Sequence, residues 1–275
     1  MNKANWKLAL AIGLCVLGAH DAPAQNRVRS NGYLGEVRDL LEKGDCAGVL
    51  KPLNAGLEEK LAPVQLVAGA MFDHGICVKP DWDRAMHFYT LADQGGEHAA
   101  AFRLAAGFAA PDRGPDVAAA LWWLSRTKPA MQVHGCKTAP DTRDHPDRFV
   151  AELKTWPQDK LRACNYAAGL VATVAGEVHY PSRALSYSVG GDYVVRFMPG
   201  VGRIEMKAGQ TREFELVGIV DGNMLAERKS LSVKNSFAEN LSEVAQRALA
   251  RYPRPQGIDP RWQFDVLFRF EVTRD

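Results

Sequence analysis

A pattern of small and aromatic residues recurs along the first half of this chain at an interval of about 35 residues. Gly69 and Ala105 lie 36 positions apart, and Phe88 and Trp122 lie 34 apart. An interval of this size predicts stacked helix pairs, because one pair can bury its apolar face only against its neighbour. We therefore expect a short helical array, with the small residues at close helix contacts and the aromatic residues filling the space beside them.

Helix start and stop signals agree with this interval. Gly75 and Gly95 are placed to end two successive helices, and Pro80 with Asp81 is placed to begin the second one. We expect the aromatic stripe of the array to form core rather than a ligand site; it comprises Phe72, Phe88, Trp122 and Trp123.

The run A-G-x-x-F-x-x-G-I-C-V-x-x-D-x-x-R-A-x-x-F-Y-x-x-L-A-x-x-G at residues 68–95 resembles the Sel-one-like repeat, a relative of the tetratricopeptide repeat. The resemblance covers about residues 30–127, with a degenerate second copy and an earlier half-copy at residues 45–56. Cys77 stands where that family usually has glycine. The resemblance implies a protein-binding or scaffolding role and brings no active site.

The C-terminal region shows strict alternation of apolar and polar residues at 262–272, which predicts a half-buried strand. Before it, apolar residues at helical spacing predict a helix over 237–249, ended by Pro253 and Pro255. Further strands are expected at 192–198, 212–220 and 224–233, the last two joined by a tight turn at Asp221 and Gly222. The fold class expected for the whole chain is α+β: helix pairs, then a small antiparallel sheet packed on a helix.

This region resembles the C-terminal domain of TonB over about residues 177–273. The shared landmarks are Tyr180-Pro181, Gly191 and the strand at 193–197, followed by the helix end at 245–253 and the last strand. The chain departs from that pattern by an extra stretch at 199–212, and by Gly-Glu-Val-His at 176–179 where TonB has a glutamine-proline-arginine segment. The second departure weakens the expectation that the usual transporter peptide binds.

The TonB resemblance implies that a partner peptide adds as a strand to the sheet. The long last strand is the expected edge, and its apolar side must cover the preceding helix. Its other side would then contact the peptide through Gln263, Asp265, Leu267 and Arg269. The alternative is a sheet whose edges are covered within the chain by the extra stretch at 199–212, since an open edge invites aggregation.

The middle of the chain, residues 128–157, is rich in Pro, Asp, Thr and Lys, which predicts irregular structure with a polar loop at 140–147. An apolar, alanine-rich run predicts a closing helix over 161–174. The expected organisation is a signal peptide at 1–24, the repeat domain at 25–128, a loop and linking helix at 129–176, and the TonB-like domain at 177–275.

The N-terminus resembles a secretory signal peptide. Lys3 and Lys7 precede an apolar run of 11 residues at 8–18, and small residues follow at Ala22 and Ala24. Eleven helical residues span about 16 Å, too short for a hydrocarbon core of about 30 Å. The expected mature protein is exported and periplasmic; the alternative is an uncleaved membrane anchor.

Four cysteines remain after the leader: Cys46, Cys77, Cys136 and Cys164. An even number in an exported chain indicates disulfides. Three pairings are possible, and the spacing favours Cys46–Cys77 with Cys136–Cys164. A zinc site is the rival interpretation, but CxxC motifs and histidines at ligand spacing are missing from the sequence.

Charge and motifs restrict the function. The chain carries 34 basic and 32 acidic residues, a balance that disfavours nucleic acid or an anionic membrane as the main partner. The sequence contains no G-x-S-x-G, H-E-x-x-H, P-loop or dinucleotide motif, so neither catalysis nor a cofactor is expected. The leading hypothesis is a periplasmic adaptor for envelope proteins, including outer-membrane transporters. The rivals are an anchored TonB-like energy transducer, and an enzyme or inhibitor whose site the sequence does not reveal.

N-terminal sequencing of the protein from its native envelope separates the first two hypotheses. We expect the mature chain to begin at Gln25, because Ala22 and Ala24 provide the small side chains that signal peptidase requires. Retention of Met1 would instead favour the anchored transducer.

Overall fold

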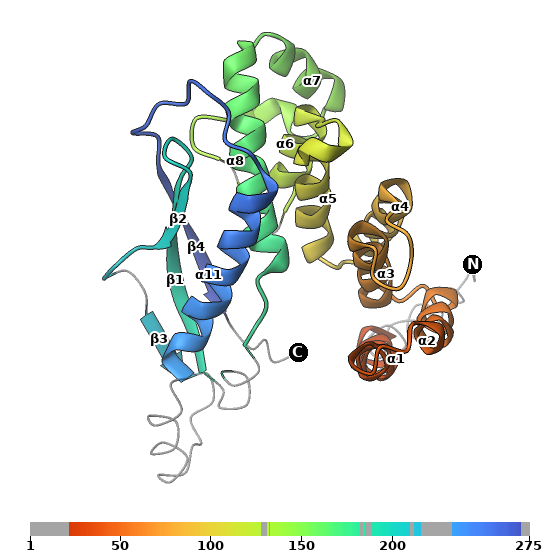
Figure 1. Ribbon diagram of the computed structural model, residues 1–275. Helices are drawn as coiled ribbons and strands as arrows, with labels where there is room; N and C mark the ends of the chain where they lie inside the picture. The colour runs from red at the N-terminus through yellow and green to blue at the C-terminus, as the bar shows by residue number, and fades with distance from the viewer. Residues whose placement is uncertain are drawn as a thin grey trace, which may run out of the picture.

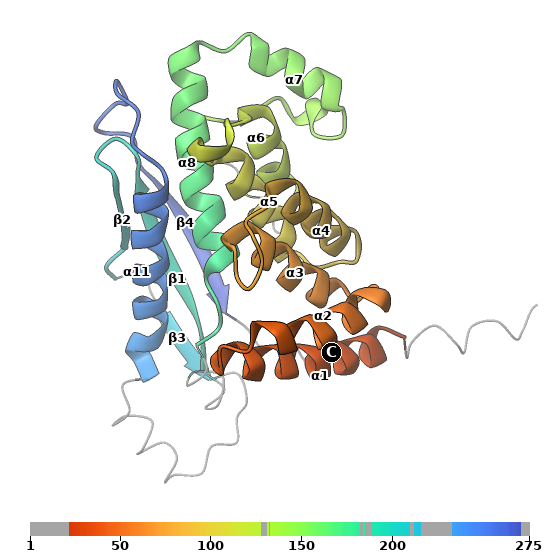
Figure 2. The same ribbon diagram turned by 45° about the vertical axis from the view of Figure 1, so that its right-hand side comes forward.

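The computed structural model describes residues 22–127, 131, 133–181, 184, 189–209, 212–215 and 233–270. Residues 1–21 of the predicted signal peptide, the predicted turn at 221–222 and all but the last residue of the strand predicted at 224–233 lie outside these residues. The described part of the chain is α+β, as the sequence predicted: helices in packed pairs, followed by an antiparallel sheet against a helix (Figures 1 and 2).

Three helix pairs form the N-terminal region. The two members of each pair, and the successive pairs, contact one another. They are α1 (Ala22–Glu42) with α2 (Cys46–Glu58), α3 (Ala62–His74) with α4 (Trp82–Gln94), and α5 (Ala99–Ala109) with α6 (Val117–Ser125). The helical array expected from the 35-residue interval is therefore confirmed as an arrangement of paired helices.

The helix ends follow the predicted signals. Asp81 caps α4, since its carboxylate accepts a hydrogen bond from the Arg84 amide at 3.0 Å. Gly75 ends α3 in the left-handed conformation, with φ of 68°. Gly95 ends α4 with φ of −78°, and the left-handed residue there is the next one, Gly96, with φ of 91°.

Close contact between α3 and α4 depends on Gly69. A Cβ atom at this position would lie 2.5 Å from the ring of Tyr89, which is fully buried. Ala105, its counterpart one interval later, is also fully buried. The expected close helix contact is confirmed, whereas the other aromatic residues of the stripe are only half-buried: Phe72, Phe88, Trp122 and Trp123.

The prediction of irregular chain over 128–157 is wrong in part. A helix, α7 (Pro146–Lys154), follows a 3₁₀ turn, η2 (Pro140–Thr142), inside this segment and begins within the predicted polar loop at 140–147. Pro146 occupies the first helical position, where a missing amide costs little. Phe149 and Leu153 are buried one turn apart, and the Phe149 ring meets Trp122 edge-on at 5.3 Å. The helix carries ordinary signals in its own sequence, with Pro146 at its start and Phe149 and Leu153 four residues apart on one face. The Pro- and Asp-rich composition of the segment obscured them.

The closing helix α8 (Gln158–Glu177) lies between the earlier helices and the C-terminal unit (Figures 1 and 2). It contacts α5 and α6 on one side and α11 (Val233–Arg251) on the other. One continuous apolar core therefore runs from Phe102 in α5 to Phe270 in the sheet. Cys136 and Cys164 form a disulfide inside this core, and Cys46 pairs with Cys77, so both favoured pairings are confirmed.

The sheet is three strands wide, with β1 (Val189–Met198) at its centre. On one edge of β1 lie β2 (Arg203–Met206) and β3 (Arg212–Glu215), one after the other; on the opposite edge lies β4 (Phe264–Phe270). All three pairings are antiparallel. The extra stretch at 199–212 thus supplies β2 and covers the β1 edge that faces away from β4.

Helix α11 covers one face of the sheet. The ring of Phe237 lies 4.8 Å from that of Tyr193 and 4.7 Å from that of Phe270. Along β4 the apolar side chains Phe268 and Phe270 are buried and the intervening ones are exposed, as the alternation predicted.

A buried ionic cluster joins the array to the end of α11. The Asp73 side chain is 2% exposed and pairs with Arg113; it also accepts a hydrogen bond from the Tyr89 hydroxyl at 3.2 Å. Arg251 lies 3.8 Å away at the end of α11. Burial raises the pKa of the Asp73 carboxyl, but Arg113, His74 and Arg251 outweigh it and leave that pKa below its ordinary value.

We expect Asp73→Asn to lower the free energy of unfolding by roughly 3–5 kcal/mol at neutral pH, because two arginines lose their buried counter-charge. Urea denaturation measures this loss. Asp159→Asn is the matched control, since Asp159 pairs with Arg162 at an exposed site and should cost about 1 kcal/mol or less.

The same cluster sets a pH dependence. A carboxyl whose pKa is lower in the folded state contributes stability above the unfolded pKa, and this contribution is lost as the pH falls through the folded pKa. The difference between wild type and Asp73→Asn should therefore shrink below about pH 4. A difference that stays constant down to pH 2 would contradict the assignment.

Candidate functional site

A groove of about 570 Å³ lies between α2 and α4, and residues of α3 also line it. Its lining is mostly apolar and comes from all three helices and from the loop that joins α3 to α4. The apolar lining residues are Leu50, Leu53, Leu57, Met71, Phe72, Val78 and Phe88. A hollow of this size and composition is typical of sites that take apolar groups.

Helix α2 forms one wall of the groove. Leu50, Leu53 and Leu57 lie three and four residues apart, so they share one helical face. Leu53 is 4% exposed and packs into the core of the first helices, whereas Leu50 at the mouth is 41% exposed. The half-copy of the repeat expected at 45–56 thus coincides with a helix that presents leucines to the groove.

Two stacked rings form the opposite wall. Phe72 of α3 and Phe88 of α4 lie with their centroids 5.8 Å apart and their planes 9° from parallel. The Arg84 guanidinium lies over the Phe72 ring at 5.2 Å, and the His87 ring meets Phe88 at 5.5 Å. These rings were expected to be core. They do pack against the cores of the array, and they also line the open groove.

Few charged groups surround the groove, and two of them, Asp81 and Arg84, form an ion pair with each other. Asp81 caps α4 and lies 3.7 Å from Arg84. The other polar residues of the lining are Asn54, Asp83 and His87, and all three are exposed. The arrangement suits the binding of apolar side chains rather than proton transfer at a buried acid or base.

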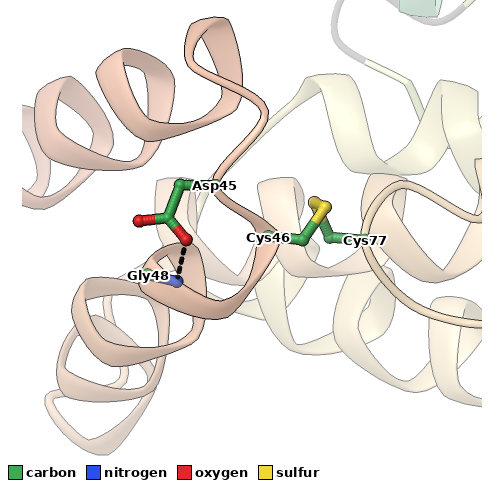
Figure 3. The surroundings of a disulfide bond; sticks show 4 residues. All are labelled: Asp45, Cys46, Gly48 and Cys77. Carbon is green, nitrogen blue, oxygen red and sulfur yellow. Dashed lines mark hydrogen bonds between the residues drawn. A yellow bond between two sulfur atoms is a disulfide. The ribbon is translucent and has the colours of Figure 1, made fainter.

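The Cys46–Cys77 disulfide joins the start of α2 to the loop between α3 and α4, next to Val78 of the groove lining (Figure 3). Cys46 is the first residue of α2, where Asp45 caps the helix through a 2.8 Å hydrogen bond from the Gly48 amide. Cys77 has φ of 60°, the left-handed conformation that glycine adopts most easily. A residue with a Cβ atom rarely adopts this conformation, and Cys77 adopts it while bonded to Cys46.

The predicted sheet-edge residues lie in a row on β4 and just before it. Leu267 is 51% exposed and Gln263 is also exposed. Asp265 accepts hydrogen bonds from Arg196 at 2.9 Å and Lys207 at 2.7 Å, and these bonds lower its pKa to about 2. Arg269 donates to Asp192 at 2.7 Å. Two of the four predicted contact side chains are thus held by ion pairs to neighbouring strands.

The strand register shows which backbone groups of β4 point outward. The Lys207 amide donates to the Val194 carbonyl at 2.8 Å, so the backbone of Val194 faces β2. Because alternate residues of a strand face opposite edges, the backbone of Val195 faces β4, where it lies opposite Val266. Val266 is therefore bonded inward, and the amides and carbonyls of Asp265, Leu267 and Arg269 point to the outer edge. Within the described residues no strand pairs with that edge.

The groove is the part of the site that sequence reasoning missed. The leucine spacing on α2 was a usable signal, but a leucine stripe fits a core face equally well. Across the described ranges, no three His, Cys, Asp or Glu side chains are grouped to hold a metal ion. No helix in the described ranges is long and apolar enough to cross a membrane.

No family model matches the chain, and comparisons with curated proteins and with solved structures also found no match.

Proposed function

We propose that this chain is an exported adaptor that binds segments of other envelope proteins and performs no catalysis of its own. The observation that carries the proposal is the groove between α2 and α4. Its half-buried Phe72–Phe88 stack and the exposed Leu50 offer apolar surface that the chain does not cover within its described residues. Exposed apolar surface gathered in one hollow is typical of a binding site.

The outer edge of β4 supports a second contact. The outward backbone groups of Asp265, Leu267 and Arg269 can pair with an extended peptide, as in strand addition. Leu267 would supply the apolar contact beside them. Asp265 and Arg269 are engaged in ion pairs with Arg196, Lys207 and Asp192, so these two side chains contribute less to the choice of peptide.

The two disulfides indicate an oxidising, extracytoplasmic location. The periplasm is the compartment we propose, on the basis of the signal-like N-terminus. The partners would then be envelope proteins, and the resemblance to the TonB C-terminal domain and to Sel-one-like repeats points to outer-membrane transporters among them. Energy transduction would additionally require an anchored N-terminus.

A substitution at the mouth of the groove tests the first surface. Leu50→Glu places a charge among apolar groups and should lower partner affinity by about tenfold or more, because burying an unpaired carboxylate is costly. Pull-down from envelope extract, followed by titration of the purified captured protein, measures this effect. Val150→Glu on α7 is the matched control, since Val150 is 37% exposed against 41% for Leu50. Equal affinities of the two variants would remove the groove from the proposal.

Two proline substitutions test the edge of β4. Leu267→Pro removes an amide that points outward, so the fold should persist while peptide binding weakens by roughly 3–10-fold, the value of one hydrogen bond. Val266→Pro removes an amide bonded to β1 and should lower the urea midpoint instead. Amide exchange of the full chain, with and without extended peptides from the periplasmic side of outer-membrane transporters, locates the contact. No added protection at residues 263–270 would exclude β4 as the peptide edge.

A further inference from the structure

The two disulfides differ in their access to solvent. Cys136 and Cys164 are 6% and 1% exposed, within the main core. Cys46 is exposed and Cys77 is half-buried. Thiol–disulfide exchange requires a thiolate to approach one sulfur directly, so the exposed bond is the one that an incoming dithiol reaches first.

The accessible bond lies at the part of the molecule that shapes the groove. Four residues after Cys46, Leu50 begins the leucine wall of α2, and directly after Cys77, Val78 lines the groove. The bond therefore joins the first residue of the helix that forms one wall to the loop that contributes Val78 to the lining.

The loop between α3 and α4 has an unusual backbone. Gly75 and Cys77 both have left-handed φ, of 68° and 60°. Hydrogen bonds hold the loop at its two ends, from the Ile76 amide to Met71 and from the Asp81 amide to Phe72, each 2.9 Å. Between these bonds the disulfide holds Cys77 in a conformation that a residue with a Cβ atom rarely adopts.

We propose that the Cys46–Cys77 bond is a redox control of the groove: its reduction loosens the α3–α4 loop and weakens binding, while Cys136–Cys164 stays intact. The reductant is a dithiol of the thiol–disulfide oxidoreductase class. One donor thiolate attacks a sulfur of the bond and forms a mixed disulfide, which the second donor thiolate resolves. The chain gains two thiols, and the donor gives two electrons and becomes a disulfide. The effect on binding rests on the function proposed for the groove, whereas the effect on the loop does not.

The first test needs no ligand. The folded chain is titrated with dithiothreitol, its free thiols are alkylated, and the labelled cysteines are read by mass spectrometry. We expect Cys46 and Cys77 to be labelled before Cys136 and Cys164, and amide exchange at residues 76–80 to rise in this half-reduced form while α8 is unchanged. Simultaneous reduction of both bonds, or unchanged exchange at 76–80, overturns the proposal.

The second test uses the neutral apolar dye Nile red as a probe of the groove. Cys46→Ser with Cys77→Ser should weaken dye binding by about fivefold or more, the factor expected when a non-glycine residue is no longer held left-handed. Cys46→Ser with Cys77→Gly should bind with intermediate affinity, because glycine adopts this turn without cost. If the variant with serine at both positions does not fold, the variant with Cys77→Gly takes its place in the test. Dye binding equal to that of the wild type in the folded variant overturns the proposal.

Leu50→Glu separates this inference from the function on which it rests. If this substitution leaves dye binding by the oxidised protein unchanged, the groove is not the dye site, and the proposed function of the groove fails. The labelling and amide-exchange results then still decide whether the bond controls the loop.

Discussion

The docking of the end of α11 on the helical array joins the two halves of this protein. The Tyr252 hydroxyl donates to the Ala106 carbonyl at 2.8 Å and lies 3.0 Å from the Thr173 hydroxyl. Its ring lies on Gly169, where a Cβ atom would come within 2.6 Å. Beside it, Arg251 reaches the buried Asp73 carboxylate. Burial raises the pKa of the Tyr252 hydroxyl above its ordinary value. The sheet is therefore held to the array through polar contacts that only correctly placed partners satisfy.

This junction leaves different surfaces on the two sides of the molecule. Helix α8 packs against α5 and α6 on one side and against α11 on the other, and α11 also covers the sheet. The apolar core therefore continues from the helical array into the sheet. At the N-terminal end, α2 and α4 leave a groove over α3, and at the other end β4 leaves an outer edge. One disulfide is buried in the continuous core and the other lies exposed beside the groove.

The sequence predicted the regular elements well where local signals and burial agree. The alternation along β4, the apolar face of α11 and the Asp81 cap of α4 all carry their own signal in the residue order. Helix α7 was missed although Pro146 and the four-residue spacing of Phe149 and Leu153 are helix signals, because the Pro- and Asp-rich composition around it indicates a loop. The surface that this face covers includes Trp122, which no local signal identifies. The outer edge of β4 was predicted, but the paired state of Asp265 and Arg269 was not. Their partners on β1 and after β2 are more than 50 residues away in the chain.

The sequence by itself determined the paired helices, the sheet with its covering helix, and the parity of the four cysteines, because each follows from periodicity, capping or count along a short stretch of chain. Only the tertiary structure decided that Phe72 and Phe88 line a groove as well as packing against the core, and that the backbone of Leu267 points outward while that of Val266 points inward. It also decided which disulfide solvent can reach. The physical reason is that the exposure of a side chain, and the sheet edge to which a backbone group points, depend on how distant segments of the chain pack together. A residue's own neighbours in the chain fix which face it occupies, but not what covers that face.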